Sequence, residues 1–253
     1  MQKIFGTFNS AGGDTPRKEP RGRRQMNMLK AACALLALMT SSYSAMPASA
    51  ADSGKVLVIL SSASQLELRD GKTPGLQHPK TLSAILKQGT ADYVGVFIPG
   101  GHAPLQDLVQ EKTLGDILVT FHATARPTGL ICHGPTALLS TVSDPVAFRK
   151  AMVAGDFTAA SKLAAGWPYA GYRLTVFSSG EEHAIEGQGN QLGGSVQFYA
   201  ADALAQAGAH VDRIGAWGVN VVEDRELVSG QQPFSSDAFG DAFVAKLKAA
   251  RGM

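Results

Sequence analysis

The chain has 253 residues, of which 45% are hydrophobic and 17% are charged, a composition that excludes a disordered or collagen-like protein. Two cysteines are too few for a disulfide-rich scaffold or a cysteine-rich zinc module. Residues 1–50 hold seven basic and two acidic side chains, a net +5, so the remaining residues carry −3 of the overall +2. Because nucleic-acid binding needs a basic face, we predict no nucleic-acid partner.

Residues 1–50 have the pattern of a leader with a secretory signal peptide. A basic stretch ends at Lys30, residues 31–39 are apolar, and Ala48 and Ala50 form a small-residue cleavage site. The apolar run is shorter than the roughly 20 residues that span a bilayer. We therefore predict an exported, periplasmic or secreted protein, cleaved near Ala50 and without a stable membrane anchor afterwards. A twin-arginine route through Arg23 and Arg24, or a buried helix in place of the signal, remain alternatives.

Residues 51–253 are predicted to form one domain in which strands and helices alternate. Continuous apolar runs predict buried strands at 55–60, 93–98 and 128–131, with a fourth strand at 173–177. Helical periodicity or composition predicts helices at 113–124, 135–141 and 196–207 and a last helix from Ser236. A strand pair is predicted at 217–222 and 226–228. The alternation indicates an α/β fold with a doubly wound, mostly parallel sheet and helices on both faces. Reactive residues are then expected at the carboxyl ends of strands.

Cys132 lies where the third predicted strand ends and a helix begins. This is the arrangement of a nucleophile elbow, and Gly134 avoids a side-chain clash in the sharp turn. The helix N-terminus is expected to favour the thiolate, and His133 offers a base or a cationic neighbour. The other cysteine, Cys33, falls in the leader. The alternative is that Cys132 is a buried, inert thiol.

Paired glycines end the second predicted strand. The backbone N–H groups of Gly100 and Gly101, together with that of His133, could hold an oxygen that develops negative charge. His102, the next residue, could line the same site. The alternative is a tight turn that only needs a positive φ.

Two motifs at this separation closely resemble the DJ-1/PfpI superfamily, and within it the Hsp31-like branch with a type 1 glutamine amidotransferase-like domain. They are Phe-Ile-Pro-Gly-Gly-His at 97–102 and Ile-Cys-His-Gly-Pro at 131–135. The resemblance implies a flavodoxin-like fold, usually a homodimer, with Cys132 as the nucleophile and His133 as its neighbour. It also implies a triad carboxylate within 177–182. We choose Glu182 first and Glu181 second, with solvated loop acids as the alternative.

The sequence departs from the family after the first strand. The family's first helix, which bears a catalytic glutamate, and its second strand are missing between Gly75 and residue 93. The only glutamate between Gly75 and Cys132 is Glu111, which follows the glycine pair. An insertion at 143–172 is expected to cover part of the sheet edge that this gap exposes.

The resemblance implies several activities: glutathione-independent glyoxalase, deglycase, peptidase-like hydrolysis and holdase chaperone. We predict a cysteine-dependent enzyme acting on small carbonyl compounds. The alternatives are a holdase that binds unfolded client proteins and an inactive, shortened homologue. His78, His122, His183 and His210 have no metal-ligand spacing, so we predict neither a metal ion nor another cofactor.

Overall fold

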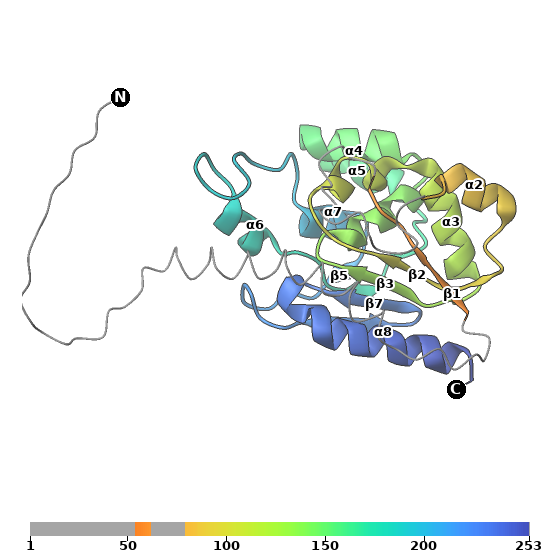
Figure 1. Cartoon of the computed structure of the whole chain (residues 1–253). Helices are drawn as coiled ribbons and strands as arrows, with labels where there is room; N and C mark the ends of the chain where they lie inside the picture. Colours follow the sequence, from red (N-terminus) through yellow and green to blue (C-terminus); the bar gives the residue numbers. More distant parts are fainter. Residues whose placement is uncertain (1–53, 62–78, 253) are drawn as a thin grey trace, which may run out of the picture.

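The computed structural model describes residues 54–61 and 79–252, so the signal peptide and the Gly75 turn lie outside the described residues. Five strands form the main sheet in the order β1-β2-β3-β7-β6 (Figure 1). Their bounds are β1 Lys55–Val58, β2 Tyr93–Ile98, β3 Thr128–Ile131, β6 Val221–Asp224 and β7 Leu227–Gly230. The first four strands in this order are parallel, and β6 runs antiparallel to β7. The predicted α/β class with a mostly parallel sheet is confirmed.

Helices cover both faces of this sheet (Figure 1). On one face α8 (Ser236–Ala250) packs Phe239, Phe243 and Leu247 against β3 and β7. The close approach of α8 requires Gly129, because a Cβ there would lie 2.9 Å from the Phe243 ring. On the other face lies the larger part of the core, around α3 (Lys112–Ala123) and the 3₁₀ helix η4 (Gly134–Thr141).

The remaining elements flank the sheet, and two strands form a separate parallel pair. These are β4 (Arg173–Leu174) and β5 (His210–Val211). The helices are α2 Leu82–Gln88, α4 Pro145–Ala154, α5 Phe157–Leu163, α6 Ser179–Ile185 and α7 Ala200–Gln206, with 3₁₀ turns η2 Ala103–Leu105, η3 Leu108–Gln110 and η5 Pro233–Ser235. No helix among the described residues is long and apolar enough to cross a membrane.

Three expectations about elements are corrected. The strand predicted at 173–177 stops at Leu174, because the Thr175 N–H donates to the Ser229 hydroxyl instead of to a neighbouring strand. The segment at 135–141 is helical but forms the 3₁₀ helix η4. The helix predicted at 196–207 begins only at Ala200.

The departure after the first strand is also partly corrected. A helix, α2, does lie between β1 and β2, capped by the Thr81 hydroxyl, which accepts from the Ala84 N–H. Among the described residues no strand lies between β1 and β2, which pair directly. Within the insertion at 143–172, α4 packs against η3 and η4, and α5 packs against α7.

Candidate active site

The nucleophile elbow predicted at Cys132 is present at the carboxyl end of β3. Cys132 has a φ of +60°, a left-handed conformation that costs energy for any residue other than glycine. Its backbone is held on both sides, because its N–H donates to the Gly230 carbonyl and its carbonyl accepts from Phe177, each at 2.9 Å. This strained backbone points to a constraint imposed by function rather than by packing alone.

Two glycines allow the ends of β2 and β3 to meet at this elbow. A Cβ on Gly134 would collide with the carbonyl oxygen of Ile98, and a Cβ on Gly100 would lie 2.9 Å from the Cys132 sulfur. Gly100 thus leaves room for the sulfur. The neighbouring Gly101, with a φ of +91°, directs its N–H at that sulfur, as does the N–H of His133. These are two of the amides expected to stabilise an oxyanion.

Three predicted residues come together as a chain of side chains. His133 Nδ1 lies 3.4 Å from Cys132 Sγ, and His133 Nε2 lies 2.7 Å from Glu182 Oε2. Both His133 and Glu182 are buried, and Glu182 is supplied by the first turn of α6. This is the geometry of a cysteine–histidine–carboxylate triad, in which the carboxylate orients the imidazole that faces the nucleophile.

The charges of the triad follow from burial and from hydrogen bonds. Burial tends to raise the pKa of Glu182, but hydrogen bonds from His102 and His133 outweigh it and lower the pKa to about 2. Burial lowers the pKa of His133, although Glu182 opposes this shift. At neutral pH the arrangement is therefore an ionised Glu182 beside a neutral His133, whose Nε2–H donates to the carboxylate. His133 Nδ1 is then free to accept a proton from the sulfur.

The prediction of a resting thiolate is corrected. Burial raises the pKa of Cys132 to about 12; the N–H groups of Gly101 and His133 oppose this shift, and the charges of Glu182 and Glu181 add to it. The helix dipole on which the prediction rested is also weaker than expected, because the element that follows is the 3₁₀ helix η4, whose hydrogen-bond geometry is poorer than that of an α-helix. The resting sulfur is a thiol, and it must lose its proton to His133 as it reacts.

His102 is more closely bound to the triad than its predicted role of lining the site implied. Its Nε2 lies 2.6 Å from Glu182 Oε1, and its ring lies 4.3 Å from the ring of His133. His102, His133 and Glu182 place ligand atoms within 4.8 Å of one another, a set that could hold a metal ion. Sequence spacing could not reveal this set, because its residues come from three separate segments.

Glu181, the second choice for the triad carboxylate, has a different position. Its Oε2 accepts from the N–H and the hydroxyl of Ser178, which makes a capping box at the start of α6. Its Oε1 accepts from the Trp217 N–H and from Gln231 Nε2. Glu181 therefore ties together three segments behind the site. Neither glutamate is a solvated loop acid, because both are buried.

An aromatic wall beside His133 was not predicted. The Phe177 ring stacks on His133 at 4.7 Å and meets the Trp217 ring edge-on at 5.9 Å. Trp217 is half-buried and has a φ of +67°, with its N–H held by Glu181. No motif marks these two residues, because 40 positions of chain separate them.

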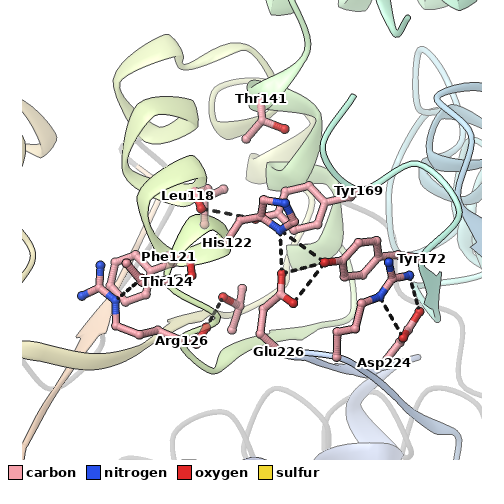
Figure 2. Close-up of polar contacts among 12 residues, drawn as sticks. Leu118, Phe121, His122, Thr124, Arg126, Thr141, Tyr169, Tyr172, Asp224 and Glu226 are labelled. Atoms are coloured by element: carbon pink, nitrogen blue, oxygen red, sulfur yellow. Dashed lines mark hydrogen bonds and ion pairs between the residues drawn. The ribbon is translucent and has the colours of Figure 1, made fainter. Parts of the chain in front are cut away.

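A second cluster of titratable groups lies at the amino-terminal ends of the central strands, opposite the ends that carry the triad. The buried Glu226 accepts from His122 Nδ1 at 2.8 Å and from the Tyr172 hydroxyl (Figure 2). Arg225 covers the Tyr172 ring at 3.3 Å. A cavity of about 450 Å³ opens beside these residues and is also lined by Lys246. Since Glu226 precedes β7 and Cys132 follows the parallel strand β3, the length of the strands separates this cluster from the triad.

Comparisons of sequence agree with these features. The model of the DJ-1/PfpI family matches residues 50–151. A protein/nucleic acid deglycase HchA of Pseudomonas aeruginosa is 26% identical over 170 residues, which cover 66% of this chain and 52% of that protein. The HchA of Staphylococcus aureus is 28% identical over 175 residues, which cover 68% and 53%. The chain thus spans about half the length of the curated relatives it matches.

Solved structures share the fold. Glyoxalase III from Candida albicans has a TM-score of 0.53 and 20% identity, with 70% of this chain and 66% of that chain covered. The Rapid Encystment Protein of Francisella tularensis has a TM-score of 0.52 and 21% identity, with 66% and 63% covered. Together with the two motifs and the elbow that they build, the family model and the HchA relatives show that the chain carries a DJ-1/PfpI family domain similar to the Hsp31-like branch.

Proposed function

We propose that this protein is a cysteine-dependent, glyoxalase-like enzyme that acts on small 2-oxoaldehydes such as methylglyoxal. The observation that carries the proposal is the triad of Cys132, His133 and Glu182, with the amides of Gly101 and His133 directed at the sulfur. The HchA relatives, which are described as deglycases, support chemistry on carbonyl adducts of the same kind. An assembled triad also favours an active enzyme over an inactive homologue.

The geometry assigns a role to each group. The Cys132 sulfur adds to the aldehyde carbon while its proton passes to His133 Nδ1, and the buried charge of Glu182 stabilises the imidazolium. The aldehyde oxygen, one bond from the attacked carbon, gains negative charge beside the amides of Gly101 and His133. Transfer of the C1 proton to C2 then converts the hemithioacetal into a 2-hydroxyacyl thioester, and water releases the 2-hydroxy acid and the thiol.

The charges around the sulfur favour a neutral substrate. Glu181 and Glu182 both raise the pKa of Cys132 through their negative charge, after the larger effect of burial. The same field repels an anionic substrate at this position. We therefore expect methylglyoxal to react better than glyoxylate, which carries a carboxylate beside its aldehyde.

The test is lactate formation from methylglyoxal by the purified protein and by its Cys132→Ala variant. We expect the wild type to form lactate and the variant to fall to the rate of buffer alone. In the uncleaved chain, the Cys33→Ala variant, which removes the other cysteine, is the matched control and should retain full activity. Equal rates for wild type and Cys132→Ala would contradict the proposal.

A holdase chaperone is the second candidate function, and one surface feature favours it. Val146 and Val153 on α4 and Phe157 at the start of α5 are 58%, 40% and 53% exposed. Exposed apolar side chains that are close in the chain can bind unfolded clients. Suppression of client aggregation should then survive Cys132→Ala and be lost in Val146→Ser/Phe157→Ser. Aggregation that proceeds unchanged with the wild type would exclude this function.

We also propose that the protein is exported and acts as a homodimer. The leader pattern of residues 1–50 supports export, and the family resemblance supports the dimer. N-terminal sequencing of the protein recovered from the periplasm or medium should begin at or near Ala51. Light scattering coupled to size exclusion should give twice the chain mass, and a monomer would contradict the dimer.

A further inference from the structure

The carboxylate of Glu182 is hydrogen-bonded to two imidazoles, those of His102 and His133. Glu182 Oε1 lies 2.6 Å from His102 Nε2, and Glu182 Oε2 lies 2.7 Å from His133 Nε2. Because the low pKa of Glu182 keeps the carboxylate ionised, both Nε2 atoms act as N–H donors. Each histidine thus directs its Nε2–H at Glu182, which leaves Nδ1 of each ring for another partner.

The two Nδ1 atoms face different surroundings. His133 Nδ1 faces the sulfur, and its side chain is 1% exposed. The side chain of His102 is 32% exposed, and no hydrogen bond to its Nδ1 forms among the described residues. His102 also follows Gly101 directly, and the Gly101 N–H points at the sulfur. A substrate bonded to Cys132 with its oxygen at that amide is therefore next to His102.

A positive charge on His102 disfavours one on His133. Their centroids are 4.3 Å apart, and after the larger effects of burial and the Glu182 hydrogen bond, the charge of His102 lowers the pKa of His133. Glu182 can stabilise either imidazolium, because each of its oxygens faces one ring. The geometry thus suits two bases that act in turn.

We propose that His102 is a second catalytic base, which moves the substrate's carbon-bound proton while His133 serves the sulfur and the oxygens. This inference rests on the proposed glyoxalase-like function. It supplies, from the described part of the chain, the acid–base group that the family takes from a glutamate on its first helix. In this chain the imidazole of His102, hydrogen-bonded to Glu182, would be that acid–base group.

The steps balance without an added oxidant or reductant. After sulfur addition, His133 returns the thiol proton to the C1 oxygen and is neutral again. His102 Nδ1 removes the proton from C1, the electron pair forms the C1–C2 double bond of an enediolate, and the His102 Nδ1–H protonates C2 after it has exchanged with solvent. The C1 hydroxyl proton passes through His133 to the C2 oxygen, so C1 is oxidised to the thioester as C2 is reduced to the alcohol. Hydrolysis by one water then frees Cys132.

The experiment compares His102→Gln and His102→Ala with a matched histidine pair in the full chain. His122 is the control, because it is 29% exposed and bonds the buried Glu226 at 2.8 Å (Figure 2). It lies at the opposite end of the parallel strands from the triad. Three quantities are measured: kcat and KM for methylglyoxal, the rate of Cys132 alkylation by iodoacetamide in a Cys33→Ser background, and rescue of turnover by free imidazole.

We expect His102→Gln to lower kcat at least about 100-fold with little change in KM, since general acid–base groups contribute factors of this size. Alkylation of Cys132, which needs only His133, should stay within about threefold, because the glutamine amide can still donate to Glu182. Imidazole should restore part of the turnover of His102→Ala, and His122→Gln and His122→Ala should behave like wild type. In D₂O, the lactate formed should carry deuterium at C2, because a base a third exposed exchanges its proton with solvent.

The outcomes separate this inference from the function on which it rests. A wild type that forms no lactate overturns the proposed function and this inference with it. An active wild type with an equally active His102→Gln overturns the inference alone. Equal losses of turnover and alkylation without imidazole rescue would show that His102 only positions Glu182, and lactate without deuterium would exclude proton transfer through His102. Either result overturns the inference.

Discussion

At the scale of single residues, Glu181 and Glu182 are adjacent in α6, yet their carboxylates accept from different partners. Successive side chains on a helix point about 100° apart, so one carboxylate reaches the histidines and the other reaches the loop behind them. The sequence motif identified both as candidates and did not separate them. The pattern of Ser178 followed three positions later by Glu181 is a capping-box signature, and it could have marked Glu181 as structural.

This division predicts that replacing Glu182 by glutamine lowers turnover, whereas the same replacement of Glu181 lowers stability. Glu182→Gln should lower turnover by about 10² to 10⁴, because a neutral amide neither orients nor stabilises the imidazolium. Glu181→Gln should leave the triad in place and lower the free energy of unfolding by about 1 to 3 kcal/mol, since it disturbs three buried hydrogen bonds and one partly buried one. Turnover and thermal unfolding of both variants check the prediction, and reversed effects would contradict it.

The state of the Cys132 proton predicts an unusual pH dependence of alkylation. An ordinary cysteine reaches a plateau above a pKa of about 8.5. Because burial raises the pKa of Cys132 to about 12, its alkylation rate should continue to rise beyond pH 10. Around neutral pH, alkylation instead proceeds with His133 as the base. Because burial lowers the pKa of His133, this base stays neutral, and the rate of this pathway should not change with pH down to pH 6.5 or below. Stopped-flow labelling in the Cys33→Ser background measures this profile, and a plateau near pH 8.5 would contradict it.

At the scale of elements, the site depends on how closely the ends of β2 and β3 approach each other. The bounds of both strands were predicted to the residue, because buried parallel strands are continuous apolar runs bounded by glycine or by the elbow. The end of β4 was not, because its backbone bonds to side chains from other segments. The pairing of His102 with Glu182, 80 positions apart, also required the fold.

Adding one methyl group at Gly134 should push the ends of β2 and β3 apart. Gly134→Ala places a Cβ against the Ile98 carbonyl oxygen, which is backbone and cannot yield without moving β2. We expect a loss of about 1 to 3 kcal/mol in the free energy of unfolding. Gly194→Ala is the control, because its Cβ meets nothing within 4 Å, and it should unfold like wild type. A Gly134→Ala variant as stable and active as wild type would contradict the described elbow.

At the scale of the whole molecule, the buried carboxylate of Glu182 links folding to pH. Its pKa of about 2 lies below the ordinary value of about 4.3 that it regains on unfolding. Its charge therefore contributes stability above pH 4.3, and that contribution is lost as the pH falls through 2. The sheet class and the helices on both of its faces followed from the alternation of strands and helices. The helix α2 did not, because its apolar pattern is short.

The corresponding prediction compares wild type with Glu182→Gln across pH. Wild type should lose up to about 3 kcal/mol more of its unfolding free energy than the variant between pH 5 and pH 2. Chemical denaturation at several pH values measures the difference. Parallel stability curves for the two proteins would contradict a carboxylate held ionised by His102 and His133.

The most direct test of the account is to trap the acyl group on Cys132. Protein mixed with methylglyoxal is quenched within milliseconds to seconds, and the peptide containing Cys132 is analysed before and after treatment with hydroxylamine. We predict an adduct on Cys132 that hydroxylamine releases as lactohydroxamate, because the hydroxamate forms from a thioester and not from a hemithioacetal. Adducts found only on lysine and arginine side chains, with Cys132 unmodified throughout turnover, would contradict the account.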